Sequence, residues 1–329
     1  MANILVVVEQ HQGKLNRVSL ETITAGQAIA AETGWALEAA VVGAANSAAV
    51  AQEIAAYKLA KVTHITGGQL AAYTSDAFAD VLKAFIAEKK PHLVLMPHTY
   101  QVRDFAPKLV TALQRGLISD AIGYKRVGND LLFTRQMFQG KFAADVSFTG
   151  DGPWFVTFQN GSFRADKIAK AEAGSAPIET FTPVGATSRN KPQEWFKEAK
   201  AAVDLTQAEI IVSVGRGIKE QKNIELAQKL AEALGGELAA SRPICDAGWL
   251  PMDRQIGSSG QTVAPKLYLA LGISGAIQHI VGMKGARSII AINKDAEAPI
   301  FEIADFAVVG NLFDVVPPLI EEIRKAKGG

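Results

Sequence analysis

The segment from Ala264 to Asp305 constrains the fold more than any other part of the chain. Its sequence, APKLYLALGISGAIQHIVGMKGARSIIAINKDAEAPIFEIAD, predicts a strand, a glycine turn, a helix, a second strand, a polar loop and a third strand. The turn and the start of the helix contribute Gly272, Ser274, Gly275, Gln278 and His279. Such a turn directs backbone N–H groups at an anion where a strand feeds a helix. We therefore expect an α/β fold that binds a phosphate-bearing cofactor near the C-terminal end of the chain.

The composition is that of an ordinary globular protein, with 48% hydrophobic and 20% charged residues. A length of 329 residues suits two domains, and a formal net charge of +1 lacks the basic excess that nucleic-acid binding requires. The single cysteine, Cys245, excludes an intrachain disulfide framework and a cysteine-cluster metal site. The start, MANILVVVEQ, predicts a strand and no signal peptide, and no stretch approaches the roughly 18 apolar residues of a membrane span. We expect a bacterial cytoplasmic protein, or a mitochondrial matrix protein whose transit peptide has been removed, with no membrane insertion.

The first half of the chain alternates strand and helix patterns, which is typical of a parallel sheet covered by helices on both faces. Apolar runs predict strands at Ile4–Val8, Ala36–Val42, Val62–Ile65 and His92–Met96. Helical periodicity predicts helices at Ser19–Thr33, Ser47–Ala56, Ser75–Glu88 and Asp104–Leu113. Beyond about Ala121, alternation at period two predicts antiparallel strands added to this sheet, at Asp130–Gln136, Lys141–Ser147 and Trp154–Gln159.

Residues 173–201 are rich in Pro, Gly, Ser and Thr and then in charge, which predicts a connection between two domains. We expect an N-terminal α/β domain at 1–190, a linker at 191–203 and a second doubly wound, mostly parallel α/β domain at 204–329. The second domain adds strands at Ala208–Ser213, Leu238–Ser241 and Ala307–Val309, and helices at Asn223–Leu234 and Val315–Arg324.

Small and basic residues recur where the predicted strands of the second domain end. Gly215-Arg216-Gly217 follows one strand, and Ser241-Arg242 stands at the end of the next. Ligands gather at the carboxyl ends of strands in a doubly wound sheet, where an arginine neutralises a phosphate. Taken singly, the first motif is about as typical of an ordinary turn, and the second is more typical of a solvated arginine.

Further polar residues follow the same pattern. The loop Gly257-Ser258-Ser259-Gly260 offers hydroxyl and N–H groups to a cofactor, although flexible loops more often have this composition. Asn293 and Asn311 each end a predicted strand, where a ribose or an adenine would be recognised. The chain has no HExxH, GxSxG or Walker A motif and no histidine–carboxylate cluster with metal-ligand spacing, so we expect no metal site.

The same residues resemble the signature of the electron transfer flavoprotein α-subunit family. LYLALGISGAIQH, then GM, IIAIN and DAEAPIFEIADF, follow that signature, and VSVGRGIK, AASRPICDAGWLPMDRQIGSSG and VAPKLY precede it in the family's order and spacing. The resemblance covers the whole C-terminal half and extends to the N-terminal start and the domain order. It implies an FAD held mainly by a Rossmann-like C-terminal domain, and an N-terminal domain that pairs with a β subunit and binds no flavin itself.

The resemblance also implies residue roles. Arg216, Ser241 and the Ser274–Gly275 turn would hold the pyrophosphate, Gln278 and His279 would lie beside the ribityl chain and the pyrimidine edge of the flavin, and Asn293 and Asn311 would serve the adenosine end. Arg242, Ser259 and His279 would tune the flavin, because a cation or a donor near N1 and the C2 carbonyl stabilises negative charge. The full implied set is Arg216, Gly217, Ser241, Arg242, Ile256, Gly257, Ser258, Ser259, Gly272, Ser274, Gly275, Ala276, Ile277, Gln278, His279, Asn293, Asn311 and Leu312.

Three positions depart from the commonest family pattern. Ser258-Ser259 stands where Gln-Thr is frequent, Val214 replaces a glycine, and Asn311 replaces an aspartate. Ser259 keeps a hydroxyl that can donate to flavin N5. The other two departures affect the expected phosphate and ribose contacts.

The function implied by the resemblance is that of an electron carrier rather than a classical enzyme. It would form a heterodimer with a β subunit and pass electrons from flavin dehydrogenases, such as the acyl-CoA dehydrogenases of fatty acid β-oxidation, to a membrane quinone oxidoreductase. An electron-bifurcating variant would use NADH and a second FAD on the β subunit, which otherwise could hold AMP. A redox-inactive nucleotide-binding module is the alternative from another class, and an NAD-dependent dehydrogenase is disfavoured because no complete GxGxxG fingerprint is present.

Overall fold

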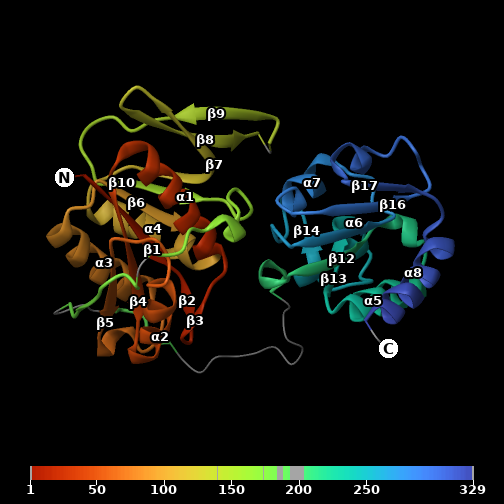
Figure 1. The fold of residues 1–329 in the computed structure, drawn as a ribbon, viewed down its shortest axis with the longest axis horizontal. Coiled ribbons are helices and arrows are strands. Elements are labelled where there is room, and N and C mark those ends of the chain that lie inside the picture. The colour runs from red at the N-terminus through yellow and green to blue at the C-terminus, as the bar shows by residue number, and fades with distance from the viewer. Residues whose placement is uncertain (1, 139, 173, 184–187, 193–203, 328–329) are drawn as a thin grey trace. The chain divides into compact units, whose positions relative to one another are not determined.

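The computed structural model of the chain describes residues 2–138, 140–172, 174–183, 188–192 and 204–327. The chain divides into two compact units, Met1–Phe196 and Lys197–Gly329, each built around one open sheet (Figure 1). Of the predicted linker at 191–203, residues 193–203 lie outside the described residues.

The first unit contains a nine-stranded sheet in the order β11-β5-β4-β1-β6-β10-β7-β8-β9. The strands that pair in parallel are β1 (Asn3–Val8), β4 (Ala36–Gly43), β5 (Lys61–Thr66), β6 (Leu93–Pro97), β7 (Leu117–Val127), β10 (Trp154–Phe158) and β11 (Ile178–Phe181). Two antiparallel strands extend the sheet beyond β7, namely β8 (Asp130–Met137) and β9 (Phe142–Val146). The predicted fold class, a parallel α/β sheet with added antiparallel strands, is confirmed for this unit.

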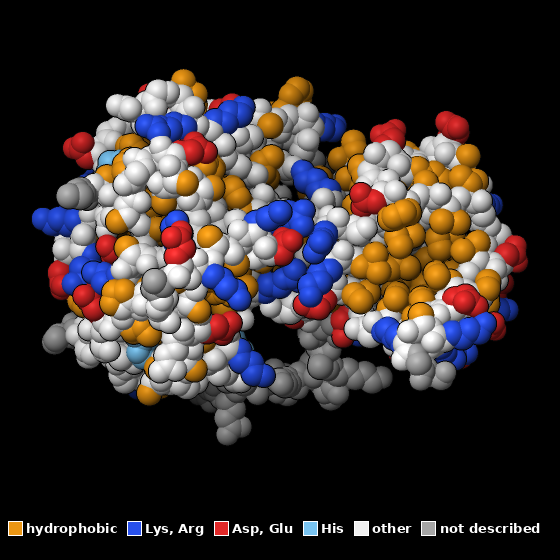
Figure 2. All heavy atoms as spheres, viewed as in Figure 1, with side chains coloured by type: hydrophobic (Ala, Val, Ile, Leu, Met, Phe, Trp, Pro, Cys, Tyr) orange, Lys and Arg blue, Asp and Glu red, His pale blue; other side chains and the backbone are white. Residues whose placement is uncertain are grey.

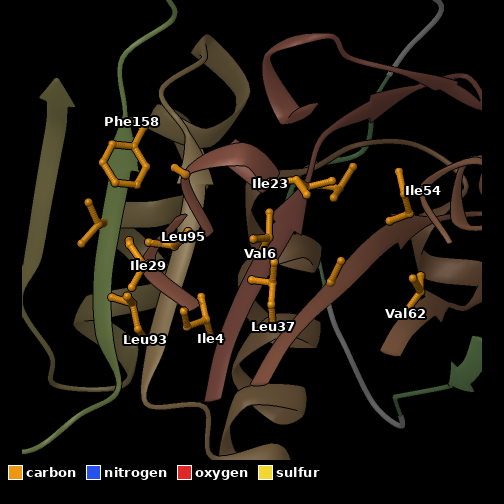
Figure 3. Packing of buried hydrophobic residues seen from close by; sticks show 14 of the residues in the cluster. Ile4, Val6, Ile23, Ile29, Leu37, Ile54, Val62, Leu93, Leu95 and Phe158 are labelled. Atoms are coloured by element: carbon orange, nitrogen blue, oxygen red, sulfur yellow. The ribbon is translucent and has the colours of Figure 1, made fainter. Parts of the chain in front are cut away.

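Helices cover both faces of this sheet. One face carries α1 (Val18–Thr33) and α2 (Ala48–Ile54), and the other carries α3 (Ser75–Lys89) and α4 (Tyr100–Ala112). In β1, Ile4 and Val6 belong to the first core and Leu5 to the second, which explains why the strand is apolar throughout. Figure 3 shows Ile23 and Ile29 of α1 packed among the side chains of β1, β4 and β6.

The structure corrects several expectations for the first unit. Trp154–Phe158 is a parallel strand between β6 and β7, and not an added antiparallel one, because four of its five residues are buried in the centre of the sheet. Strands β7 and β11 were not predicted, nor was the short hairpin β2 (Gln10–His11) with β3 (Lys14–Leu15). Helix α4 begins four residues earlier than expected, since the Thr99 hydroxyl accepts a hydrogen bond from the Val102 N–H and caps it.

The second unit contains a fully parallel six-stranded sheet in the order β14-β13-β12-β15-β16-β17. Its strands are β12 (Ile210–Val214), β13 (Glu237–Ser241), β14 (Gln255–Ile256), β15 (Leu267–Leu271), β16 (Ile289–Asn293) and β17 (Phe306–Val309). Counted along the chain, the order is 3-2-1-4-5-6, which is that of a dinucleotide-binding fold. The predicted doubly wound architecture is confirmed here too, although the short strand β14 was missed.

Helices α5 (Ile224–Leu234), α6 (Arg242–Asp246) and α8 (Leu312–Ala326) share the core on one face of this sheet. Helix α7 (Ile277–Met283) and the 3₁₀ turn Pro299–Ile303 share the core on the other face. Among the described residues, no helix is both long and apolar enough to cross a membrane.

Candidate functional site

The strand order of the second unit reverses between β12 and β15, and the predicted site residues lie along the carboxyl edge around this reversal. Ligands of open α/β sheets bind in the crevice that such a reversal creates. Each of the six strands contributes at its carboxyl end or in the loop that follows: Arg216 and Gly217 after β12, Ser241 and Arg242 at β13, Ile256–Ser259 at β14, Gly272–His279 after β15, Asn293 at β16, and Asn311 and Leu312 after β17.

Two glycine loops cross at the reversal. The Gly215 N–H donates to the Leu271 carbonyl at 2.9 Å, and the Gly217 N–H donates to the Gly272 carbonyl at 3.0 Å. A Cβ on Gly217 would stand 2.5 Å from the Gly272 Cα, and Gly272 itself has a φ of +60°. These glycines therefore let two loops meet, which is a different use from the phosphate approach that the sequence indicated for Gly217.

Beyond this crossing, the chain presents a run of free backbone donors. Within the described residues, the N–H groups of five consecutive residues donate to no protein acceptor: Ser274, Gly275, Ala276, Ile277 and Gln278. All of them except Gly275 are exposed. Consecutive unpaired N–H groups form a concave site that attracts an anion. We call residues 274–278 the N–H nest.

The loop after β14 packs directly against the helix that follows the N–H nest. The Ser258 N–H donates to the Gln278 carbonyl at 2.7 Å. A Cβ on Gly282 of α7 would stand 2.4 Å from the Gly257 N, and a Cβ on Gly257 would stand 2.8 Å from the Gln278 carbonyl oxygen. The Ser259 hydroxyl accepts a hydrogen bond from Gln255 Nε2 at 3.0 Å, which leaves its own proton free to donate outward. Gln255 Oε1 is buried and has no partner among the described residues.

Two arginines bring positive charge to the edge. Arg216 is exposed and pairs with no carboxylate in the described part of the chain. The Arg242 side chain is 65% exposed, and its Nε donates to Asp246 Oδ2 at 3.2 Å one helical turn away. An exposed pair of this kind is weak, so an anionic ligand can compete with Asp246 for Arg242.

Several predicted residues already have protein partners. Asn293 donates from Nδ2 to the Ile273 carbonyl at 2.9 Å and accepts from the Asp295 N–H. Asn311 caps α8, because its Oδ1 accepts from the Phe313 N–H at 3.4 Å. The side chains of Ile256 and Leu312 lie in the cores. Their roles toward a cofactor stay predictions.

His279 is buried and both of its ring nitrogens are engaged. Nε2 lies 2.9 Å from the Tyr268 hydroxyl, and Nδ1 lies 3.1 Å from the Ile256 carbonyl. Burial lowers the pKa of His279 to about 4, although the Ile256 carbonyl acts in the opposite direction. A neutral ring with both nitrogens engaged has no N–H left for the pyrimidine edge of a flavin, so the predicted donor role of His279 requires these partners to change.

Sequence reasoning missed Tyr268 and Gln255, which support the site from beneath. Tyr268 is fully buried on β15, and burial raises the pKa of its hydroxyl. The available signal was the position of a tyrosine in an otherwise aliphatic strand, since a buried hydroxyl usually finds a partner.

Cys245 is buried as well, and its burial together with Asp246 and Asp253 raises the pKa of the thiol to about 11, so it is no nucleophile. No group of three metal-ligating side chains occurs among the described residues.

Comparisons with known proteins agree with this arrangement. The model of the electron transfer flavoprotein domain matches residues 4–185, and that of the electron transfer flavoprotein FAD-binding domain matches residues 204–284. The electron transfer flavoprotein subunit α of Bacillus subtilis is 39% identical over 98% of this chain and 97% of its own. That of Syntrophomonas wolfei is 38% identical over 99% and 100%, and the acryloyl-CoA reductase electron transfer subunit β of Anaerotignum propionicum is 36% identical over 99% and 96%. The chain therefore belongs to the electron transfer flavoprotein α-subunit family, and its C-terminal unit contains the FAD-binding domain of that family.

Proposed function

We propose that the chain holds one FAD at the carboxyl edge of the second unit and acts as the α subunit of a heterodimeric electron carrier. It takes electrons from flavin dehydrogenases such as acyl-CoA dehydrogenases and passes them to a membrane quinone oxidoreductase. The N–H nest beside the crossing of the two glycine loops is the observation that carries this proposal. The relatives named above come from bacteria, which supports a bacterial cytoplasmic location.

The donor set fits a dinucleotide. The five N–H groups of the nest suit a pyrophosphate, and Arg216 supplies a cation that pairs with no side chain in the described part of the protein. Ser241 and Gly217 border the same edge, and the exposed Ile277 side chain gives an apolar surface for a ring. FAD, when bound, supplies the capacity to accept and release electrons, and the protein sets its potential.

Ser259 and Arg242 are the residues that we propose to tune the flavin. The Ser259 hydroxyl is oriented by Gln255 and retains a proton for a ring nitrogen. Arg242 supplies positive charge that stabilises the reduced, more negative cofactor. The buried Gln255 Oε1, unpaired among the described residues, is a second acceptor that a bound group or a water can satisfy.

The Arg242→Ala variant tests this assignment. Its flavin midpoint potential should fall by on the order of 60 mV, the shift that a tenfold change in a one-electron equilibrium produces. Lys229→Ala, which removes an exposed cation from another i,i+4 pair on α5, should leave the potential unchanged. An unchanged potential in Arg242→Ala would remove Arg242 from this role.

The decisive measurement for the whole proposal is the visible spectrum and flavin content of the chain purified with its β subunit. One FAD per heterodimer without NADH oxidation supports the simple carrier. Two FAD per heterodimer with NADH oxidation would identify the bifurcating alternative. A colourless protein, or one that contains only AMP, would contradict the proposal and support a redox-inactive nucleotide-binding module instead.

The surface of the second unit supports a partner subunit. Phe306 and Val309 of the edge strand β17 are 62% and 59% exposed, and Figure 2 shows hydrophobic side chains gathered over a broad area of this unit. Large exposed apolar areas usually mark interaction surfaces. We propose that the β subunit covers part of this area.

A further inference from the structure

A buried pair of side chains lies beneath the N–H nest and has no role in the function proposed so far. Tyr268 lies on β15, one of the two middle strands of the sheet, and His279 lies in the first turn of α7. Both are almost inaccessible, with exposed fractions of 0% and 6%. The hydroxyl and Nε2 are 2.9 Å apart, which is the distance of a good hydrogen bond.

The partners of the ring determine where its proton lies. A backbone carbonyl only accepts, so the contact between Nδ1 and the Ile256 carbonyl requires the proton on Nδ1. Nε2 of a neutral ring is then an acceptor, and the Tyr268 hydroxyl must be the donor. Burial keeps the pKa of His279 near 4, so the ring is neutral at physiological pH.

The His279 ring also connects two parts of the site, the Gly257–Gly260 loop and the N–H nest, whose relative position it helps to fix. Ile256 immediately precedes the Gly257–Gly260 loop, and His279 immediately follows the N–H nest. The Ser258 N–H bonds to the Gln278 carbonyl on the same side, so the loop and the helix are connected through backbone and ring together. A ring that turned would move the nest relative to Ser259.

We propose that Tyr268 is a positioning residue of the flavin site, which locks His279 in its neutral Nδ1–H form and thereby holds the N–H nest against the Gly257–Gly260 loop. This inference rests on the proposed function for the identity of the ligand. Tyr268 is fully buried and acts through His279. A neutral His279 also leaves the stabilising positive charge to the arginines.

Selective ¹⁵N-histidine labelling of the full chain tests the tautomer without any ligand, because the chain has only five histidines. His279→Asn, which keeps an N–H donor toward Ile256, assigns the signal by its loss. In the wild type, Nδ1 should be protonated and Nε2 unprotonated from pH 5 to 8. A His279 signal that titrates in this range, or that shows the proton on Nε2, would overturn the proposal whether or not Tyr268→Phe folds.

Tyr268→Phe should leave Nε2 without its donor, mix the tautomers and weaken FAD binding about tenfold, as expected for one buried acceptor left unpaired. Tyr124→Phe is the matched control, since it removes a hydroxyl bonded to Glu32 at 2.7 Å in the other unit and should change neither readout. If Tyr268→Phe lowers only the thermal stability and leaves the tautomer and the FAD affinity unchanged, Tyr268 has a merely structural role and the proposal is wrong. If the wild type binds no FAD, the proposed function fails, while the labelling experiment still decides the tautomer.

Discussion

Gly217 and Gly272 show how a missing side chain determines the shape of the site. Their backbones approach so closely that a Cβ on either would stand 2.5–2.6 Å from the other's Cα. The Gly217→Ala variant must separate the two loops, so we expect a loss of about 1–3 kcal/mol in stability and weaker FAD binding. Thermal denaturation and FAD titration measure these effects.

Gly68→Ala is the matched control, because nothing lies within 4 Å of the Cβ it would add. If Gly217→Ala is as stable as this control and binds FAD normally, the crossing of the loops is not required for the site.

At the level of residues, sequence reasoning predicted a site at one edge of the sheet but not the partners that its residues have within the protein. Ligands of open α/β sheets bind at the carboxyl ends of the strands, so the polar and small residues after each strand can be found once the order of the strands is known. All 18 predicted positions lie on the carboxyl edge or beside it. The contacts of His279 with Tyr268 and Ile256 depend on packing between elements, and no local pattern encodes them. The same holds for Gly217. It has no room for a side chain because the loop at Gly272, 55 residues later in the sequence, approaches it closely.

At the level of elements, polar side chains of helix α1 hold the segment that follows β10. Glu21 accepts from the Gly161 N–H at 2.7 Å, Thr24 donates to the Arg164 carbonyl at 3.3 Å, and Gln27 forms two hydrogen bonds with the backbone of Ala169. These three residues form a stripe at spacing three along the helix. They fix the segment that follows β10 across α1.

Glu21 makes this attachment dependent on pH. Burial raises its pKa from 4.5 to about 7, although the Gly161 N–H and Arg17 lower it. A raised carboxyl pKa contributes stability that is fully present below pH 4.5 and is lost as the pH rises through about 7. The shift corresponds to about 3 kcal/mol.

We therefore expect the urea midpoint to fall between pH 5 and pH 8, and to fall less in Glu21→Gln, whose amide is neutral throughout. Glu53→Gln, which changes an exposed carboxylate on α2, should keep the wild-type slope. If the urea midpoint changed equally with pH in all three proteins, Glu21 would not be the source of the pH dependence.

The elements that sequence patterns missed share a physical cause. β14 has two residues and β11 has four, too few for a period to show, and β11 lies within the Pro- and Thr-rich segment that indicated a linker. β10 alternates as an antiparallel strand would, yet it inserts between β6 and β7 because both of its faces are buried. Long elements with clear periods, such as α1 and α3, were predicted within one or two residues.

At the level of the whole molecule, the segment after β11 is fixed to the first unit by charge. Asp76 on α3 forms ion pairs with Lys108 and Arg189, and its Oδ2 also accepts from the Arg189 N–H at 3.1 Å. Hydrogen bonds from Lys108 and then from Arg189 hold the pKa of Asp76 well below its usual range. A lowered carboxyl pKa contributes stability above pH 3.8 that is lost as the pH falls further. The attachment should therefore persist at neutral pH and weaken in acid.

Trypsin can report on this attachment, since it cleaves after Arg189, where the described segment 188–192 is fixed by Asp76. The Asp76→Asn variant removes the charge that Arg189 pairs with, so cleavage at this bond should become several-fold faster. High salt should accelerate cleavage of the wild type in the same way and have little effect on the variant. Asp145→Asn, which breaks an exposed pair with Lys125 on the antiparallel strands, is the control and should leave the rate unchanged. Equal rates in all three proteins would mean that Asp76 does not hold the segment 188–192 against the first unit.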